Sequence, residues 1–316
     1  MVSGLVTFGE TMGLVSSLDI GPLRHASRLG LGVAGSESNV AIGVRRLGRP
    51  AAWMGRVGDD ELGRLVLARL RGEDVDVGAA TVDPEAPTGL MLKAARTAGT
   101  VRVTYYRAGS AGSRLAPGHL DEARIRAADV LHLTGITAAL SASARAAVFA
   151  AAETARGAGV PVAVDPNHRA ALWKAGEAAP VLRDLAARAD VVIAGAAEAR
   201  LLVDAQEPSQ AAEAIHRAWG CDAIVTLGAD GATAVLDGTA HRVPAVPVAV
   251  VDPVGAGDGF CAGYLAALLE GAGAAERLRM AAAVGAFAVT TRGDWEGLPD
   301  RAEFDRLTDG GDAVTR

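Results

Sequence analysis

Short apolar runs alternate with amphipathic segments along most of the chain. Short apolar runs are typical of buried strands, whereas apolar positions that recur every three or four residues are typical of helices. The predicted strands are residues 5–8, 51–57, 130–133, 162–165, 191–194, 223–227, 233–236 and 243–251. The predicted helices are residues 38–47, 60–71, 141–158, 178–188, 198–203, 208–219, 258–270 and 274–290. This order predicts an α/β fold in which helices flank a mostly parallel sheet.

Two regions break the alternation. Residues 11–33 and 88–107 contain short strand-like runs with no amphipathic helix to cover them. Within the second region, residues 89–93 and 100–107 predict a β-hairpin with Gly99 in its turn. These regions predict a small sheet outside the helix-covered one.

The most informative segment is residues 251–265, which read VDPVGAGDGFCAGYL. Gly255, Ala256 and Gly257 form a turn of nearly bare backbone before a predicted helix, and free N–H groups at a helix start favour an anion such as phosphate. Asp258 would repel phosphate, so it is better suited to take a proton from an attacking hydroxyl. The alternative is a glycine-rich turn capped by Asp258. Small residues at 261–263 imply close packing of this helix on the sheet.

Composition narrows the class of protein. The chain has 316 residues, of which 50% are hydrophobic and 22% charged, with a net charge of −6. This suits one large α/β unit, so we expect a single domain over residues 1–316. The mixed charges do not suggest a nucleic-acid partner. Two cysteines, no signal peptide and no membrane span predict a cytoplasmic protein.

Residues 252–265 resemble the second signature of the ribokinase/PfkB family of carbohydrate kinases. Part of the first signature is also present, as Ala34-Gly35, Asn39, Ala41, Gly48 and Gly58. The resemblance covers roughly residues 4 to 300. It implies a ribokinase-like, doubly wound, mostly parallel sheet with a small β lid, formed from about residues 11–33 and 88–107, that closes over a sugar. In such a family Asp258 is the catalytic base, and the turn from Gly255 to Gly257 stabilises the transferred phosphoryl group.

The resemblance also implies ATP and magnesium (Mg²⁺) as cofactors. The implied nucleotide-binding residues are Asn167, Thr226, Leu227, Gly228, Ala229, Asp230, Gly231, Gly255, Ala256 and Gly257. Glu198 corresponds to a family residue that organises Mg²⁺ indirectly, although Gly195 replaces its usual Asn partner; it could equally be an ordinary acid in a helix first turn. Asp252 either caps the turn or contacts a cation. Pro253, where many relatives have Thr, leaves a monovalent cation uncertain.

Several segments resemble one subfamily, the 2-keto-3-deoxygluconate kinases: residues 105–113, 131–136, 165–169 with 172–173, 252–258 and 291–297. The implied substrate-binding residues are Gly35, Tyr105, Arg107, Arg169, Asp258 and Asp294. The chemistry agrees, because a buried sugar carboxylate needs a cationic partner and two arginines could supply it. The alternatives are a surface turn around Arg169 and packing of the lid by a tyrosine. Met91 and Ala282 depart from the subfamily, at positions for the sugar and the nucleotide.

The expected function is therefore ATP-dependent phosphorylation of the terminal hydroxyl of 2-keto-3-deoxygluconate. Two alternatives remain open: a kinase for a neutral sugar, of the fructokinase or ribokinase type, and a catalytically idle sugar or nucleotide sensor. The intact Asp258 argues against the sensor. Because an exposed sheet edge invites a partner, a homo-oligomer is also expected.

Overall fold

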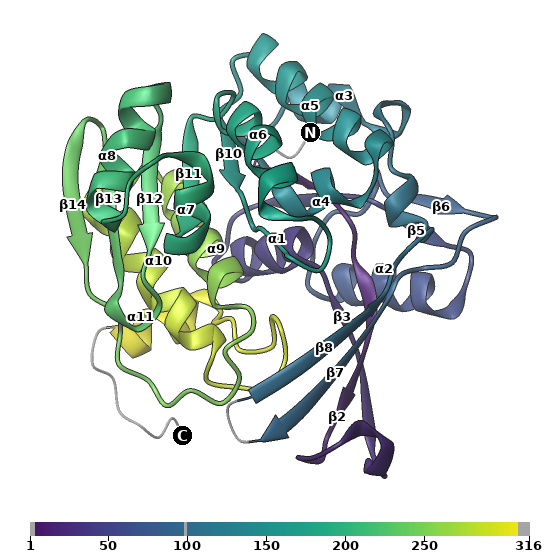
Figure 1. Cartoon of the computed structure of the whole chain (residues 1–316). Helices are drawn as coiled ribbons and strands as arrows, with labels where there is room; N and C mark the ends of the chain where they lie inside the picture. Colours follow the sequence, from purple (N-terminus) through teal and green to yellow (C-terminus); the bar gives the residue numbers. More distant parts are fainter. Residues whose placement is uncertain (1–3, 98–99, 309–316) are drawn as a thin grey trace.

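The computed structural model describes residues 4–97 and 100–308. Its main sheet has eight strands in the order β14-β13-β12-β11-β10-β9-β1-β4, of which only β13 runs antiparallel to the others (Figure 1). The strands are β1 (Leu5–Phe8), β4 (Ala51–Met54), β9 (Val130–Thr134), β10 (Val162–Asp165), β11 (Val191–Gly195), β12 (Asp222–Thr226), β13 (Ala232–Leu236) and β14 (Thr239–Val243). The expected α/β class is confirmed.

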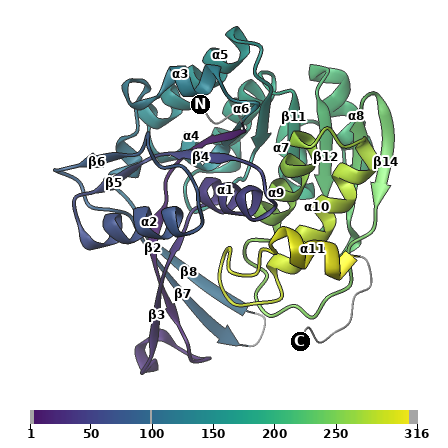
Figure 2. The same cartoon turned by 180° about the vertical axis from the view of Figure 1, so that it is seen from behind.

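Helices cover both faces of this sheet, as Figures 1 and 2 show from opposite sides. One face carries α1 (Ser36–Arg46), α2 (Glu61–Gly72), α9 (Ala256–Leu269), α10 (Ala274–Ala288) and α11 (Arg301–Thr308). The other carries α3 (Glu122–Arg126), α4 (Gly135–Leu140), α5 (Ala142–Gly157), α6 (Ala175–Ala186), α7 (Ala196–Leu202) and α8 (Pro208–Trp219). Within residues 4–97 and 100–308, no helix is long and apolar enough to cross a bilayer.

Each central strand contributes to two hydrophobic cores. Leu5 packs into the core under α1, α9 and α10, whereas the next residue, Val6, packs into the core under α5 and α6. All four residues of β1 are buried. A strand buried on both faces needs a continuous apolar run rather than alternation, which is why such runs are visible in the sequence.

A second sheet, the small sheet, has four strands in the order β3-β2-β7-β8 and projects from the main body in Figure 1. Its strands are β2 (Met12–Ser17), β3 (Leu29–Ala34), β7 (Leu90–Thr97) and β8 (Thr100–Tyr106). Met12, Leu14, Ala34 and Met91 form an apolar cluster on one of its faces. The strands expected in both uncovered regions are present, while the predicted turn at Gly99 lies outside the described residues.

The predicted strand 51–57 is two strands that belong to different sheets. β4 lies in the main sheet, whereas β5 (Arg56–Gly58) pairs with β6 (Thr81–Asp83) in a two-stranded sheet. The chain changes direction at Gly55, where a Cβ atom would lie only 2.0 Å from the Trp53 ring. The shorter 3₁₀ helices are η1 (Leu23–His25), η2 (Gly112–Arg114), η3 (Pro117–His119) and η4 (Gly228–Asp230).

The predicted strand 243–251 is wrong. β14 ends at Val243, and residues 244–250 have no regular structure. Pro244 and Pro247 have no N–H group for a sheet ladder, so this segment cannot pair fully with a neighbouring strand. Its alternating valines, Val246, Val248 and Val250, line a cavity instead.

Candidate active site

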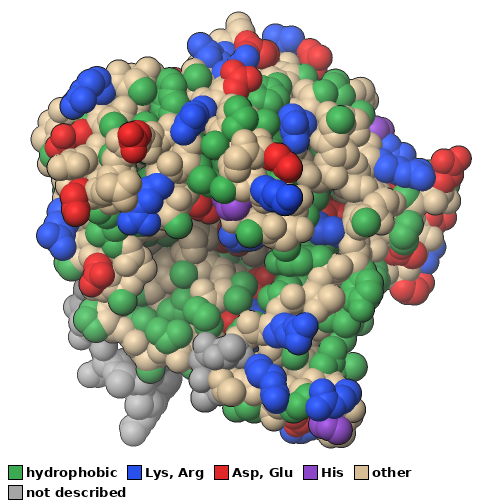
Figure 3. Space-filling model, in the orientation of Figure 1, with side chains coloured by type: hydrophobic (Ala, Val, Ile, Leu, Met, Phe, Trp, Pro, Cys, Tyr) green, Lys and Arg blue, Asp and Glu red, His purple; other side chains and the backbone are tan. Residues whose placement is uncertain are grey.

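A cavity of about 400 Å³ lies where the carboxyl ends of the main-sheet strands face the small sheet. Figure 3 shows this side of the molecule hollowed between the upper body and the small sheet. Carboxyl ends of parallel strands are the usual binding edge of a doubly wound sheet. The predicted site residues that line the cavity are Gly35, Tyr105, Arg107, Asn167, Arg169, Glu198, Thr226, Gly255, Ala256, Gly257, Asp258 and Asp294.

The first turn of α9 presents bare backbone to this cavity. Gly255 caps the helix with φ of +89°, and a Cβ atom there would lie 2.1 Å from the carbonyl oxygen of Asp294, so only glycine fits. A Cβ atom on Gly257 would meet nothing within 4 Å, so this residue faces open space. The amide groups at this helix start carry partial positive charge, which makes the turn a suitable cradle for phosphate.

Asp258 is the third residue of α9, and both of its carboxylate oxygens accept hydrogen bonds. Ser36 Oγ donates to Oδ1 at 2.7 Å, and Asn39 Nδ2 donates to Oδ2 at 2.7 Å. Burial raises the pKa of Asp258, while these two bonds and the charge of Arg169 oppose the rise. The carboxylate is therefore held in one orientation beside the glycine turn, which would suit a general base.

The sequence reasoning missed Ser36 as a partner of Asp258. Ser36 Oγ also accepts a 2.8 Å hydrogen bond from Asn167 Nδ2. Asn167 has φ of +38°, and its backbone N–H donates to Asp165 Oδ1 at 2.9 Å. Asn167 thus lies in the hydrogen-bond network of Asp258. Asn39 belonged to the first signature, but no local pattern marked Ser36.

Two more carboxylates lie at the strand ends. Burial raises the pKa of Asp165 well above its usual range, and the charges of Glu198 and Asp258 add to the rise. Glu198 accepts the backbone N–H of His168 at 2.8 Å and that of Gly195 at 2.7 Å, so it joins the ends of β10 and β11. Within residues 4–97 and 100–308, no group of three or more acidic, His or Cys side chains is placed to chelate a metal directly.

Arg107 reaches the cavity from the end of β8 in an ion pair that the sequence did not predict. Its Nε and Nη2 atoms donate to Glu10 Oε2 at 2.7 and 2.6 Å, and Ser110 Oγ donates to Glu10 Oε1. The Arg107 guanidinium also lies 5.5 Å from the Tyr105 ring centre. Arg169, by contrast, is exposed and forms no ion pair in the described part of the chain. The structure therefore brings both predicted arginines to one cavity.

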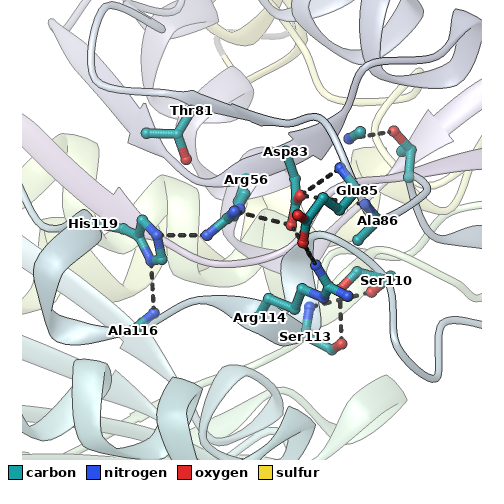
Figure 4. A network of polar contacts seen from close by, with 12 residues as sticks. Arg56, Thr81, Asp83, Glu85, Ala86, Ser110, Ser113, Arg114, Ala116 and His119 are labelled. Atoms are coloured by element: carbon teal, nitrogen blue, oxygen red, sulfur yellow. Dashed lines mark hydrogen bonds and ion pairs between the residues drawn. The ribbon is translucent and has the colours of Figure 1, made fainter.

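A polar network around Asp83 includes Ser110, Ser113 and Arg114 of the loop after β8 (Figure 4). Asp83 at its centre pairs with Arg56 at 3.0 Å and with Arg114 at 3.5 Å. The backbone N–H groups of Glu85 and Ala86 donate to Asp83 Oδ1 at 2.9 and 3.2 Å. These contacts tie the loop to β6, and through Ser110 they fix the partner of Arg107.

A second cavity, of about 480 Å³, adjoins the first across the start of α9. Both cavities are lined by Thr226, Pro253, Ala256 and Gly257. The second is also lined by Gly228, Ala229, Gly231, Val246, Val248, Val250, Phe260, Ala282 and Val289. Such apolar walls suit a flat aromatic ring. Of the residues predicted for the nucleotide, Leu227 and Asp230 line neither cavity, and Asn167 lines the first.

Comparison with known proteins agrees with this geometry. Residues 3–301 match the profile of the family described as pfkB family carbohydrate kinase. The chain is 38% identical to a 2-dehydro-3-deoxygluconokinase of Bacillus subtilis (strain 168), over 95% of this chain and 93% of that protein. It is also 38% identical to a 2-dehydro-3-deoxygluconokinase of Thermoproteus tenax, over 96% of this chain and 93% of that protein.

The fold also matches a solved structure that contains nucleotide. A protein of E. coli provisionally named ribokinase II, in complex with ATP and Mg²⁺, superposes with a TM-score of 0.91. The two are 27% identical, and the match covers 98% of this chain and all of that one.

Proposed function

We propose that this chain, which belongs to the pfkB family of carbohydrate kinases, transfers a phosphoryl group from ATP to the terminal hydroxyl of 2-keto-3-deoxygluconate (2-dehydro-3-deoxygluconate). The product is 2-keto-3-deoxy-6-phosphogluconate. As a family member the chain is a phosphotransferase with an alcohol acceptor. The substrate proposal rests on one observation: Arg107 and Arg169 line the cavity that also contains Asp258. Its relatives of the same activity support it.

The two cavities give each reactant a place. A nucleotide base in the second cavity would direct its phosphates to the start of α9, where the amides of Gly255 to Gly257 stabilise the charge of the transferred group. A sugar in the first cavity would place its terminal hydroxyl beside Asp258, which takes the proton. The small sheet would act as a lid that keeps water from the phosphoryl group.

Magnesium fits this site only indirectly. Asp165 and Glu198 would hold Mg²⁺ through water, and the bound ion would neutralise charge on the phosphates of ATP. This accords with the raised pKa of Asp165, which burial raises most and the charges of Glu198 and Asp258 raise further. The positive charge of the exposed Arg169 opposes the rise in the pKa of both Asp165 and Asp258.

The carboxylate of a keto acid would lie between the two arginines. Glu10 engages the Nε and Nη2 atoms of Arg107, and a guanidinium has five N–H donors in all, so the Nη1 side can still bind a ligand. Arg169 has its whole planar fork available for two parallel hydrogen bonds. A neutral sugar would have no use for two such cations.

The test is kcat/KM for the keto acid, fructose and ribose, from ADP release by the wild type and two variants. Arg169→Lys keeps the charge but loses the fork, and Arg107→Ala removes both. We expect each to raise KM for the keto acid, by roughly 10- to 150-fold for a lost charge-assisted bond, and to change any weak activity on fructose little. Arg102→Ala, an exposed arginine of β8, is the control.

Two outcomes would overturn the sugar-acid assignment. One is a wild type that prefers fructose or ribose. The other is an equal loss of both activities in the arginine variants. Because Arg107→Ala also leaves Glu10 without its partner, thermal melting must accompany the kinetics. Arg169→Lys removes no ion pair of the described structure and is the cleaner of the two variants.

A further inference from the structure

Lys93 is a buried lysine of β7 that the sequence gave no reason to select. Its Nζ atom lies 2.7 Å from Asp252 Oδ2, 2.7 Å from Asp294 Oδ1 and 3.4 Å from the carbonyl oxygen of Gly293. The lysine side chain is 6% exposed, and each carboxylate is 7% exposed. Burial by itself would lower the pKa of Lys93, but the two carboxylates outweigh burial and raise it, so the ammonium is charged.

The two carboxylates belong to the loops that build the phosphate cradle. Asp252 Oδ1 accepts the N–H of Val254 at 3.2 Å, and its Oδ2 accepts the N–H of Gly293 at 3.3 Å. The carbonyl of Asp294 packs directly against Gly255, the cap of α9. By binding both carboxylates, Lys93 holds these loops together immediately behind the turn.

We propose that Lys93 supplies, as a side chain, the cation that fixes the phosphate cradle, so that phosphoryl transfer by this chain needs no monovalent metal ion. The ammonium lies among three oxygens from two loops, an arrangement that would suit an ion such as K⁺. A K⁺ ion beside Asp252 would have to share this space with a buried positive charge. The residues present therefore do not fit a monovalent cation, and Pro253 is compatible with its absence.

Lys93 acts at a distance from the reacting atoms and is a positioning residue. It does not line the cavity, whereas Met91, two residues earlier on the same face of β7, does. Lys93 extends from the small sheet. The phosphate cradle therefore receives this cation only when the small sheet lies against the main body. Arg292 makes a second link, since its Nη1 atom donates to the carbonyl of Leu18 at 3.0 Å. A lost Lys93 should therefore lower kcat more than it raises KM for the sugar.

The wild type provides the first test without any substitution. Its kcat and its KM for ATP are measured at constant ionic strength in KCl, in NaCl and in tetramethylammonium chloride, an ion too large for the site. We expect the same values in all three salts. Selective stimulation by K⁺ would overturn the proposal, because it would show a functional monovalent site in the presence of Lys93.

Substitution of Lys93 provides the second test. Lys93→Ala should lower kcat by about 10²-fold, the effect of a small misplacement of catalytic groups. K⁺ or NH₄⁺, but not tetramethylammonium, should restore much of that loss by occupying the space left by the ammonium. The same ions should raise the melting temperature of Lys93→Ala and not that of the wild type, since they would bind only the folded variant. Arg96→Met, which removes an exposed cation from the same strand, is the matched control.

Lys93→Arg keeps the proposal testable if Lys93→Ala folds poorly. A guanidinium retains the positive charge between the two carboxylates, so Lys93→Arg should keep more activity than Lys93→Ala and show no K⁺ stimulation. Wild-type kcat in Lys93→Ala without added cations would overturn the proposal. So would a loss that neither small cations nor arginine can relieve. These tests of Lys93 measure phosphoryl transfer alone and can use any sugar that the enzyme accepts. Failure of the substrate proposal would therefore not affect the proposal for Lys93.

Discussion

Asp258 experiences two opposing influences on its charge. Burial favours the neutral acid, whereas Ser36, Asn39 and Arg169 favour the carboxylate, and the balance leaves its pKa raised. A raised pKa brings a carboxylate closer to the basicity that a general base needs near neutral pH. It also means that ionisation of Asp258 lowers the free energy of unfolding.

Asp258→Asn should abolish turnover and spare binding. The amide matches the carboxylate in size but cannot take a proton, so we expect kcat to fall by at least roughly 10²-fold. Binding of the keto acid, measured by calorimetry, should weaken far less. Near-normal turnover in this variant would contradict the assignment of Asp258 as the base.

The same substitution should stabilise the fold. A carboxyl group whose pKa is raised by folding contributes stability that is fully present below its unfolded pKa of about 3.8 and is lost as the pH rises through the folded pKa. At neutral pH the wild type carries this loss and Asp258→Asn does not. Melting temperatures measured from pH 4 to 8 should favour the variant increasingly as the pH rises. Asp59→Asn, an exposed acid, should show no such trend.

Gly257→Val tests the phosphate cradle. A valine side chain would extend into open space, so the protein should fold normally, but the side chain would occupy the space through which ATP oxygens approach the helix amides. We expect KM for ATP to rise and kcat to fall. Circular dichroism checks the fold. Full activity in a folded variant would disprove the cradle.

Most of the residues that sequence motifs singled out lie together around one cavity in the structure. Asp258, Gly255 and Arg169 belong to short segments whose spacing is visible in the sequence. Glu10, Ser36 and Lys93 do not, because each acts through a partner about 100 or more positions away. Such contacts depend on how the sheets and helices come together, which no local pattern records.

At the scale of elements, the sequence predicted most main-sheet strands and the longer helices well and several short helices poorly. The bounds of β1, β10 and α8 agree with the structure, since each has a clear apolar pattern between breaks. The short helices α3, α4 and α11, of five to eight residues, were not predicted, although the seven-residue α7 was. The segment 244–250 was mistaken for a strand because its valines occupy every second position, as they would in a strand, although they line a cavity.

The element pair β5–β6 depends on Asp83. Its side chain is 1% exposed and pairs with Arg56, which is 18% exposed. Asp83→Asn should lower the free energy of unfolding by about 2 kcal/mol, the effect of losing a hydrogen bond to a charged group. The expected control is Asp59→Asn, whose partner Arg64 is exposed and whose loss should matter little.

The pKa of Asp83 predicts how the stability that this residue contributes changes with pH. Burial raises the pKa of Asp83, but backbone N–H groups and the two arginines outweigh it and leave the pKa lowered. The stability that Asp83 contributes is therefore present above its unfolded pKa of about 3.8 and is lost as the pH falls through the folded value. Urea unfolding at pH 7 should separate the wild type from Asp83→Asn. A constant difference down to strongly acidic pH would refute this account.

At the scale of the whole molecule, both the main sheet region and the small sheet contribute residues to the candidate site. The main sheet and the helices on it supply Asp165, Glu198 and the start of α9, while β7 and the end of β8 supply Met91, Lys93 and Arg107. We expect the small sheet to move as a lid over a single domain. Its strands were predictable from their alternation, but their order β3-β2-β7-β8 was not, because it joins segments far apart in the chain.

The small sheet is apolar on both faces, which predicts a partner. Met12 and Met91 line the cavity and pack with Leu14 on one face, whereas the opposite face has Leu29 and Leu31 exposed. Strand register aligns Leu31 with Val15 and Val15 with Leu92, so the apolar row crosses three strands, and the exposed Tyr106 lies on the same face of β8. A mixed sheet with one face in water should be polar on that face. An exposed apolar patch of this kind usually marks an interface.

We therefore expect a homo-oligomer in which copies of the chain cover this face for one another. Sedimentation of the wild type at micromolar concentration should give more than the monomer mass, and Leu31→Lys should shift it toward monomer, because a buried ammonium at the interface would lack a partner. Val82→Lys, a change of another exposed strand residue outside the small sheet, should leave the mass unaltered. A monomeric wild type would refute the expectation. If the wild type assembles and Leu31→Lys assembles equally well, the interface lies on another surface, and the apolar row needs a different explanation.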